Sequence, residues 1–197
     1  MGAMLWLEHL GLDERQDDIR IQVVGDQPVL AQALEAGTIE ATVLDGVFSQ
    51  RLKQKGFPIL GEFHQVNQRL MGQAVVVKGA YLQQHPDTLE NLLKAQIEGL
   101  AFVFSPRSKP AVLNTLTNRL RISDPAVLEE GYQDIFRFVD RKPYPSLEGL
   151  RNVQRLMKTR NARVANIKTE DLIDSRFLRK LDESGFIDRL YSTYGAK

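Results

Sequence analysis

The sequence of 197 residues contains no cysteine and only three histidines. Without cysteine the chain has no disulfide, no thiolate metal ligand and no cysteine nucleophile. His9, His64 and His85 lie far apart in the sequence, and none has the spacing of metal ligands. His85 is followed by Pro86 and Asp87, an order typical of a helix start rather than of a catalytic base. The sequence therefore predicts neither a metal site nor a bound cofactor.

The short motifs that carry common chemistry are also missing. There is no phosphate-binding P-loop, no G-x-G-x-x-G dinucleotide motif and no G-x-S-x-G nucleophile motif. The acidic pairs at 13–14 and 17–18 stand in polar surroundings, which is typical of solvated surface. The aromatic residues fall at helix-core spacing, which favours a core role over a stacking platform for bases. The residues alone do not predict an enzyme.

Charge of one sign is not concentrated anywhere in the chain. There are 26 Lys and Arg residues against 25 Asp and Glu residues, and the net charge is +1. Because the basic residues are spread along the whole chain, we expect no nucleic-acid partner and no anionic membrane partner. No apolar run reaches the length that spans a bilayer, and the first residues show no basic region of a signal peptide.

What the sequence does contain is an alternation of short β-branched runs and helical patterns. Ile19–Val24 is a β-branched run that stops at the turn pair Gly25-Asp26. Pro28 suits the first turn of a helix, where its missing N–H is not needed. Gly37 suits the end of that helix, because glycine adopts the left-handed conformation without strain. The pattern predicts a strand, a turn and a helix.

The same order repeats directly afterwards. Ile39–Leu44 predicts a second strand, and it stops at Asp45-Gly46. Val47–Lys55 predicts a second helix that ends at Gly56, and Pro58–Phe63 predicts a third extended piece. Strands that alternate with helices at this spacing favour parallel pairing with right-handed crossovers. We therefore expect an α/β lobe.

In open α/β sheets a ligand binds beyond the carboxyl ends of the strands, where helix N-termini offer free N–H groups. The predicted ligand-binding residues are those at the two strand ends: Gly25, Asp26, Gln27, Asp45, Gly46 and Phe48. The alternative is that both turns are ordinary and that aspartate is present because it caps helices. The carboxylate of Asp45 would accept hydrogen bonds from a cationic or hydroxylated ligand, whereas the N–H groups of Gly46 and Val47 would hold a carboxylate. The charge of the ligand stays open.

The second part of the chain has a different pattern. Ala74–Val77 is a compact β-branched run, and everything after it has helical spacing. We predict helix starts at Pro86 and Pro125, with Ser123 as N-cap of the latter, and Ser146 as the cap of a further helix. Helical patterns are expected over these ranges: 4–12, 89–100, 112–120, 125–139, 146–157 and 169–185. The predicted organisation is an α/β part, 1–73, and a mostly helical part, 74–197.

Four stretches resemble one protein family. Residues 33–41, ALEAGTIEA, are similar to its AL-x-AG-x-(I/V)-(D/E)-A signature, and Phe48–Leu60 is similar to the helix and strand that follow. Residues 81–100 resemble the segment that re-enters the first lobe, and 141–149 together with 185–188 resemble a subgroup of receptors. The family is that of type II periplasmic solute-binding proteins of the nitrate/sulfonate/taurine ABC-transporter group.

The resemblance implies two α/β lobes joined by crossing segments, with a small solute held between the lobes when they close. Residues 1–68 would be most of lobe two, 64–77 the return crossing, and the helical remainder part of lobe one. The implied function is the substrate-binding component of an ABC transporter, with a permease as partner and a periplasmic or extracytoplasmic location. The fold class expected from the sequence is thus a partial periplasmic-binding-protein type II-like α/β fold.

The family begins with a strand-helix-strand portion that does not precede Met4. We therefore expect unpaired strand edges and exposed apolar faces. From the same argument, either another chain completes the sheet, through self-association or strand swapping, or the helical half has repacked.

Two other functions stay open. Such lobes also occur fused to signalling domains, so the chain would then be a ligand-sensing domain. The same superfamily includes an enzyme that makes the pyrimidine precursor of thiamine, but its iron site is rich in cysteine and histidine, whereas this chain has no cysteine and only three scattered histidines.

Overall fold

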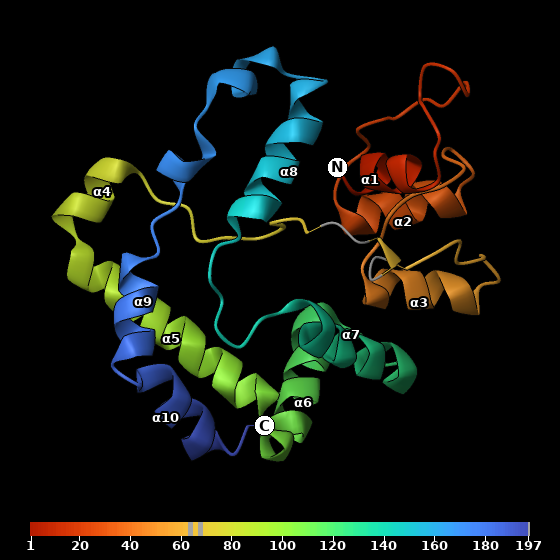
Figure 1. The fold of residues 1–197 in the computed structure, drawn as a ribbon. Coiled ribbons are helices and arrows are strands. Elements are labelled where there is room, and N and C mark those ends of the chain that lie inside the picture. Colours follow the sequence, from red (N-terminus) through yellow and green to blue (C-terminus); the bar gives the residue numbers. More distant parts are fainter. Residues whose placement is uncertain (63–64, 67–68, 197) are drawn as a thin grey trace.

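The computed structural model describes residues 1–62, 65–66 and 69–196 of the chain. Within these residues the regular structure is helical throughout, with no β-strand (Figure 1). The α-helices are α1 Gly2–His9, α2 Gln27–Glu35, α3 Gly46–Gln54, α4 Gly79–Gln84, α5 Pro86–Phe104, α6 Lys109–Leu120, α7 Pro125–Phe138, α8 Leu147–Lys158, α9 Arg176–Glu183 and α10 Phe186–Tyr194. Short 3₁₀ helices are η2 Pro106–Ser108, η3 Ala162–Asn166 and η4 Thr169–Leu172.

The prediction of an α/β fold with a parallel sheet, and with it the periplasmic-binding-protein type II-like fold class, is wrong. Ile19–Val24, Ile39–Leu44 and Ala74–Val77 belong to no strand, and no backbone hydrogen bond joins them to another described residue. Pro58–Glu62 likewise forms no strand, and Phe63 lies outside the described residues. A β-branched run fits a strand only where a neighbour pairs with it, and the sequence pattern does not supply that neighbour.

The helices of the α/β prediction are present at nearly the expected bounds. Pro28 lies in the first turn of α2, and Gly37 follows its end with a φ of +68°. Helix α3 is followed by Gly56 with a φ of +91°. In this left-handed region only glycine is free of strain, so the helix ends predicted from these two glycines are confirmed.

The main core lies in the second part of the chain. Helices α9 and α10 pack along one side of the long helix α5 (Figure 1). The buried cluster between them consists of Ile97, Ala101, Phe104, Leu178, Leu181, Ile187, Tyr191 and Ala196. Two hydrogen bonds fix its edge: Ser105 Oγ donates to the Tyr194 carbonyl at 2.6 Å, and the Tyr191 hydroxyl donates to the Arg141 carbonyl at 2.9 Å. Amphipathic faces at helical spacing thus produce a closed core.

Three details of the helical part differ from the prediction. Asp124, not Ser123, caps α7, and its Oδ1 accepts hydrogen bonds from Ala126 N–H at 2.8 Å and Val127 N–H at 3.2 Å. The segment that begins at Thr169 is 3₁₀ rather than α-helical. Gly185 ends α9 as expected, but a further helix, α10, follows it directly. The Ser146 cap is confirmed by its 3.0 Å bond from Gly149 N–H.

Several contacts join the first part of the chain to the second. Helix α3 packs on α7, where a side chain at Gly131 would lie only 2.6 Å from Val47 Cγ2. Helix α1 is tied to α8 by Arg155, whose guanidinium donates to the Glu8 carboxylate at 2.7 and 2.9 Å. The segment that leads to α4 crosses the N-terminal end of α8, where a side chain at Gly149 would clash with backbone. The division at residues 73 and 74 stays a prediction.

The chain exposes far more surface than a compact protein of its mass. Its accessible surface is 13584 Å², whereas a compact monomer of 22.3 kDa exposes about 9,400 Å². Part of the excess is apolar and lies on the extended segments: Val23 is 96% exposed, Leu60 81% and Val76 87%. These residues lie on segments that form no strand, so the unpaired strand edges expected from the sequence are absent from the described residues.

Candidate functional site

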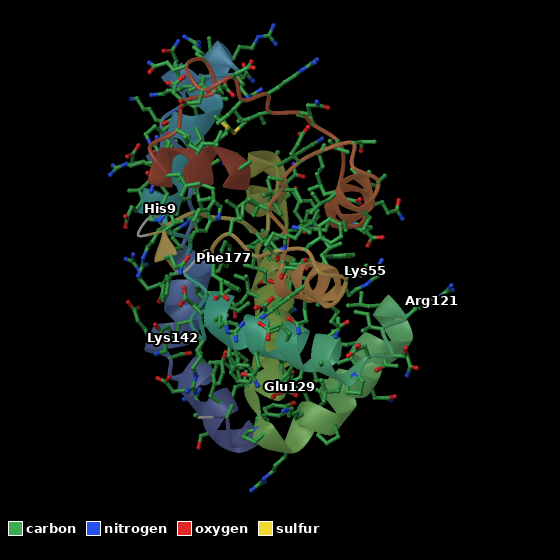
Figure 2. All side chains as sticks on the ribbon, turned by 90° about the vertical axis from the view of Figure 1, so that its right-hand side faces the viewer. His9, Lys55, Arg121, Glu129, Lys142 and Phe177 are labelled. Carbon is green, nitrogen blue, oxygen red and sulfur yellow. The ribbon has the colours of Figure 1, made fainter. Side chains whose placement is uncertain are left out.

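The two turns predicted to bind ligand lie side by side. The Gln27 side chain, in the first turn of α2, accepts a hydrogen bond through Oε1 from Asp45 N–H at 3.1 Å. Lys55, which Figure 2 labels, directly follows the last residue of α3. Its Nζ lies 2.7 Å from Oε1 of Glu35, the last residue of α2. Helices α2 and α3 therefore run in the same direction, and their N-termini form one rim. We call residues 25–27 and 45–48 the α2/α3 rim.

Both aspartates of the rim act as helix caps. Asp26 Oδ1 accepts from Val29 N–H at 3.4 Å, and Asp45 Oδ1 accepts from Phe48 N–H at 3.2 Å. Each carboxylate is exposed to solvent and uses one oxygen for its cap. Capping is thus a role that the structure gives to both residues, as the alternative interpretation expected.

A carboxylate from the second part of the chain lies on the rim. Asp134, on α7, accepts a hydrogen bond through Oδ2 from Gly46 N–H at 2.7 Å. A side chain at Gly46 would place its Cβ 2.0 Å from that oxygen, so only glycine permits this approach. The N-terminus of a helix favours negative charge through its free N–H groups and its dipole. The first turn of α3 therefore carries two carboxylates, those of Asp45 and Asp134.

The environment of Asp134 sets its protonation. Burial raises the pKa of the Asp134 carboxyl, and the nearby Glu130 raises it further. The Gly46 N–H and the guanidinium of Arg137 favour the charged form but do not cancel the effect of burial. Arg137 is shared, because it pairs with both Glu130 and, at 3.2 Å, Asp134. The position is thus already rich in negative charge.

The N–H group of Phe48 lies in the α2/α3 rim, and its ring lines a hollow. This hollow of about 180 Å³ lies between α2 and α3, and Pro28, Gln32 and Leu52 also line it. The guanidinium of Arg51 lies 5.9 Å from the centroid of the Phe48 ring. Such a volume admits only a few heavy atoms.

Asp134 is the residue that the sequence analysis missed. Val127, Gly131 and Asp134 follow one another at i, i+4 and i+7 and so share one face of α7. Val127 is buried on that face, and Gly131 admits Val47 of α3. The signal in the sequence is an acidic residue that follows a glycine on the buried face of a helix. This pattern does not identify the helix that packs against that face.

Other site classes find little support within the described residues. No group of three His, Cys, Asp or Glu side chains there could hold a metal ion. No helix in that part of the chain is long and apolar enough to cross a membrane. A second hollow, of about 230 Å³, lies between α5 and α9. Of the charged residues that line it, Glu90 and Lys180 pair with each other at 2.6 Å, and Arg176 pairs with Asp174 at 2.6 Å.

Comparison with known proteins identifies no relative: no family model, curated protein or solved structure matches the chain. The likeness to solute-binding proteins therefore stays a prediction from the four sequence stretches.

Proposed function

We propose that this chain captures a small solute as the substrate-binding component of an ABC transporter. The single observation that carries the proposal is the α2/α3 rim, where Asp45 N–H meets the Gln27 side chain at 3.1 Å. Asp134 contributes to the same rim from the other part of the chain, so a solute there would contact both parts. Proteins that bind a ligand between two parts couple binding to a change in their arrangement.

The charges of the rim select the kind of solute. Asp26 and Asp45 are exposed, and Asp134 occupies the N–H group that an anion would use. A further anion would meet like charges and would have to displace Asp134, which costs binding energy. A solute with an ammonium, a hydroxyl or a protonated ring nitrogen finds acceptors instead. The proposed solute is therefore a small molecule with hydrogen-bond donors rather than nitrate or a sulfonate.

The role in transport follows from the resemblance. A solute held across the two parts would stabilise one arrangement of the chain, and a membrane permease would recognise that arrangement. On this proposal the chain works outside the cytoplasm, in the periplasm or an equivalent space.

A thermal-shift screen of amino acids, amines, hydroxylated pyrimidines, nitrate and sulfonates tests the proposal. We expect a donor-bearing compound to raise the melting temperature and the two anions to have no effect. If no compound of any class binds, solute capture by this chain is wrong.

Calorimetry on three variants with the compound that binds then tests the rim. Asp45→Asn keeps the cap but removes the charge, and we expect it to weaken binding by about 10- to 100-fold, the size of one charge-assisted hydrogen bond. Asp134→Asn is expected to weaken it as well. Glu35→Gln, at the opposite ends of α2 and α3, is the matched control and should leave affinity unchanged. Equal affinity of all three variants would place the solute elsewhere.

A further inference from the structure

The hollow between α2 and α3 adjoins the α2/α3 rim. The two helices pack against each other, and the hollow between them has a volume of about 180 Å³ (Figure 1). Phe48, a residue of the rim, lines it with its ring, and Pro28 lines it directly after Gln27 of the rim. The buried side chains of Ala31 and Leu52 give the hollow an apolar lining. A solute bound at the rim can therefore extend into this hollow.

The two charged residues that line the hollow differ in their partners. Glu35 is paired with Lys55 Nζ at 2.7 Å, so its charge is compensated. The exposed guanidinium of Arg51 forms no ion pair or hydrogen bond with any residue that the structure describes, and it lies 5.9 Å from the centroid of the Phe48 ring. A guanidinium binds a carboxylate through two parallel N–H groups, and it retains this ability when it stands beside an aromatic ring. Arg51 therefore offers the hollow a cation for which a carboxylate is the matching partner.

Asp45 and Arg51 place opposite charges along α3. They are six residues apart, which is about 9 Å along a helix axis, and Phe48 lies halfway between them in the sequence. Asp45 Oδ1 accepts from Phe48 N–H at 3.2 Å, and the Arg51 guanidinium stands over the Phe48 ring. A molecule that follows the hollow from the rim thus meets an anion, then an apolar ring and then a cation.

We propose that the solute is an amino acid whose ammonium and carboxylate groups are separated by a short apolar chain. Its ammonium binds Asp45, its chain lies against the ring of Phe48, and its carboxylate binds Arg51. This inference rests on the proposed capture of a solute at the rim and adds the chemical class of that solute. An α-amino acid carries both charges on one carbon atom, which is a poor match to side chains rooted more than one helical turn apart.

Four small probes and the unmodified full-length chain test the class of solute by calorimetry. 4-Aminobutanoate has the two charges at opposite ends, 2-aminobutanoate has both at one end, butylamine has the ammonium alone, and butanoate the carboxylate alone. We expect 4-aminobutanoate to bind about 10-fold more tightly than each of the other three, the size of one additional charge-assisted hydrogen bond at an exposed site. Equal affinity of 4-aminobutanoate and butylamine, or of the two aminobutanoates, would contradict the proposal.

Two variants of α3 then locate the carboxylate. Arg51→Gln removes the guanidinium and should reduce the affinity for 4-aminobutanoate to that for butylamine, without a change in the affinity for butylamine. Lys53→Gln is the matched control, because it removes the same charge from the same helix two residues further on, away from the face of Arg51. It should leave both affinities unchanged. A circular-dichroism spectrum that each variant shares with the unmodified chain shows that the variant is folded.

The outcomes separate this inference from the proposed function. Butylamine binding that depends on Asp45, together with 4-aminobutanoate binding that Arg51→Gln does not weaken, would overturn the inference and leave solute capture at the rim intact. If none of the four probes binds, the inference is wrong, and the wider screen of compounds then decides the proposed function.

Discussion

Residues 86–196 enclose a continuous apolar cluster, whereas residues 1–62 contain single buried residues between exposed extended segments. In the first region, Ile97 and Ile187 are fully buried between helices that satisfy their own backbone hydrogen bonds. In residues 1–62, Val23 and Leu60 face solvent on extended segments, and no backbone hydrogen bond joins residues 19–24 to another described residue. A helix can complete its hydrogen bonds alone, but an extended segment needs a second strand. Helices in residues 86–196 therefore complete their backbone hydrogen bonds within themselves, whereas the extended segments in residues 1–62 would need a second strand to do so.

The largest expected effect tests this difference with a pair of truncations. Ile187→Ala removes a fully buried side chain from the cluster, and we expect it to lower the free energy of unfolding by about 2–5 kcal/mol. Val23→Ala removes a side chain that is 96% exposed and should change it by less than about 0.5 kcal/mol. Chemical denaturation of both variants measures the difference. Similar losses would mean that residues 1–62 are packed as well as residues 86–196.

A pair of glycine substitutions tests the contact between α3 and α7, which joins the two regions. Gly131→Ala on α7 would bring a Cβ within 2.6 Å of Val47 Cγ2, so we expect a loss of about 1–3 kcal/mol. Gly99→Ala on α5 meets no atom within 4 Å and should stabilise the chain by about 0.5–1 kcal/mol, because alanine favours a helix. Urea unfolding of both variants gives the two values. A stabilising Gly131→Ala would show that α3 and α7 do not pack closely.

Removal of a helix cap in each region tests the same comparison with smaller expected losses of stability. Asp124 accepts two backbone hydrogen bonds and one from Gln54 at 3.1 Å, so Asp124→Ala should cost about 1–2 kcal/mol. Asp26 accepts one long bond of 3.4 Å, and Asp26→Ala should cost about 0.5 kcal/mol. Thermal unfolding of the two variants ranks them. The reverse order would contradict the cap geometry of α2 and α7.

The smallest effect concerns the pH dependence of Asp134. Burial raises the pKa of this carboxyl in the folded chain, so the folded state holds its proton more tightly than the unfolded state. Its contribution to stability is therefore highest below the pKa of the unfolded chain and falls as pH rises through the folded pKa. We expect Asp134→Asn to melt slightly above the unmodified chain at pH 7. The difference should shrink as the pH falls through the folded pKa and be lost below about 4, near the ordinary aspartate pKa of about 3.9.

The control for this pH series is a carboxyl with the opposite shift. Hydrogen bonds from Lys142 and Tyr144 lower the pKa of Asp182, so its stabilising contribution is present at neutral pH and is lost as pH falls through the folded pKa. Asp182→Asn should therefore melt below the unmodified chain at pH 7. An Asp134→Asn variant that behaves like Asp182→Asn would contradict the buried environment of Asp134.

The sequence predicts the local features of this fold well and the pairing between segments poorly. Pro28, Gly37, Gly56 and Ser146 mark helix ends correctly because capping and left-handed glycine conformations depend on neighbouring residues only. The prediction of strands at Ile19–Val24 and at the other β-branched runs is wrong. A strand needs a hydrogen-bonded partner, and β propensity does not specify that partner.

The candidate site shows the same limit. The two turns of the rim follow from local signals, and the Gln27 side chain joins them, but the parallel sheet from which we expected them to lie together is absent from the described residues. Asp134 is 88 residues away from Gly46 in the sequence, so no local pattern connects the two. That contact depends on how α7 packs on α3, which becomes visible only in the structure.

Hydrogen exchange of the backbone amides tests the difference between the two regions most directly. We predict that the amides of Ile97 and Ala101 in α5 exchange slowest, because they open only with the cluster. The amides of residues 19–24 and 39–44 should exchange nearly as fast as those of an unfolded peptide, because no described residue pairs with their backbone. Strong protection of both these segments would show that they form a sheet in solution, and the all-helical fold would then be wrong.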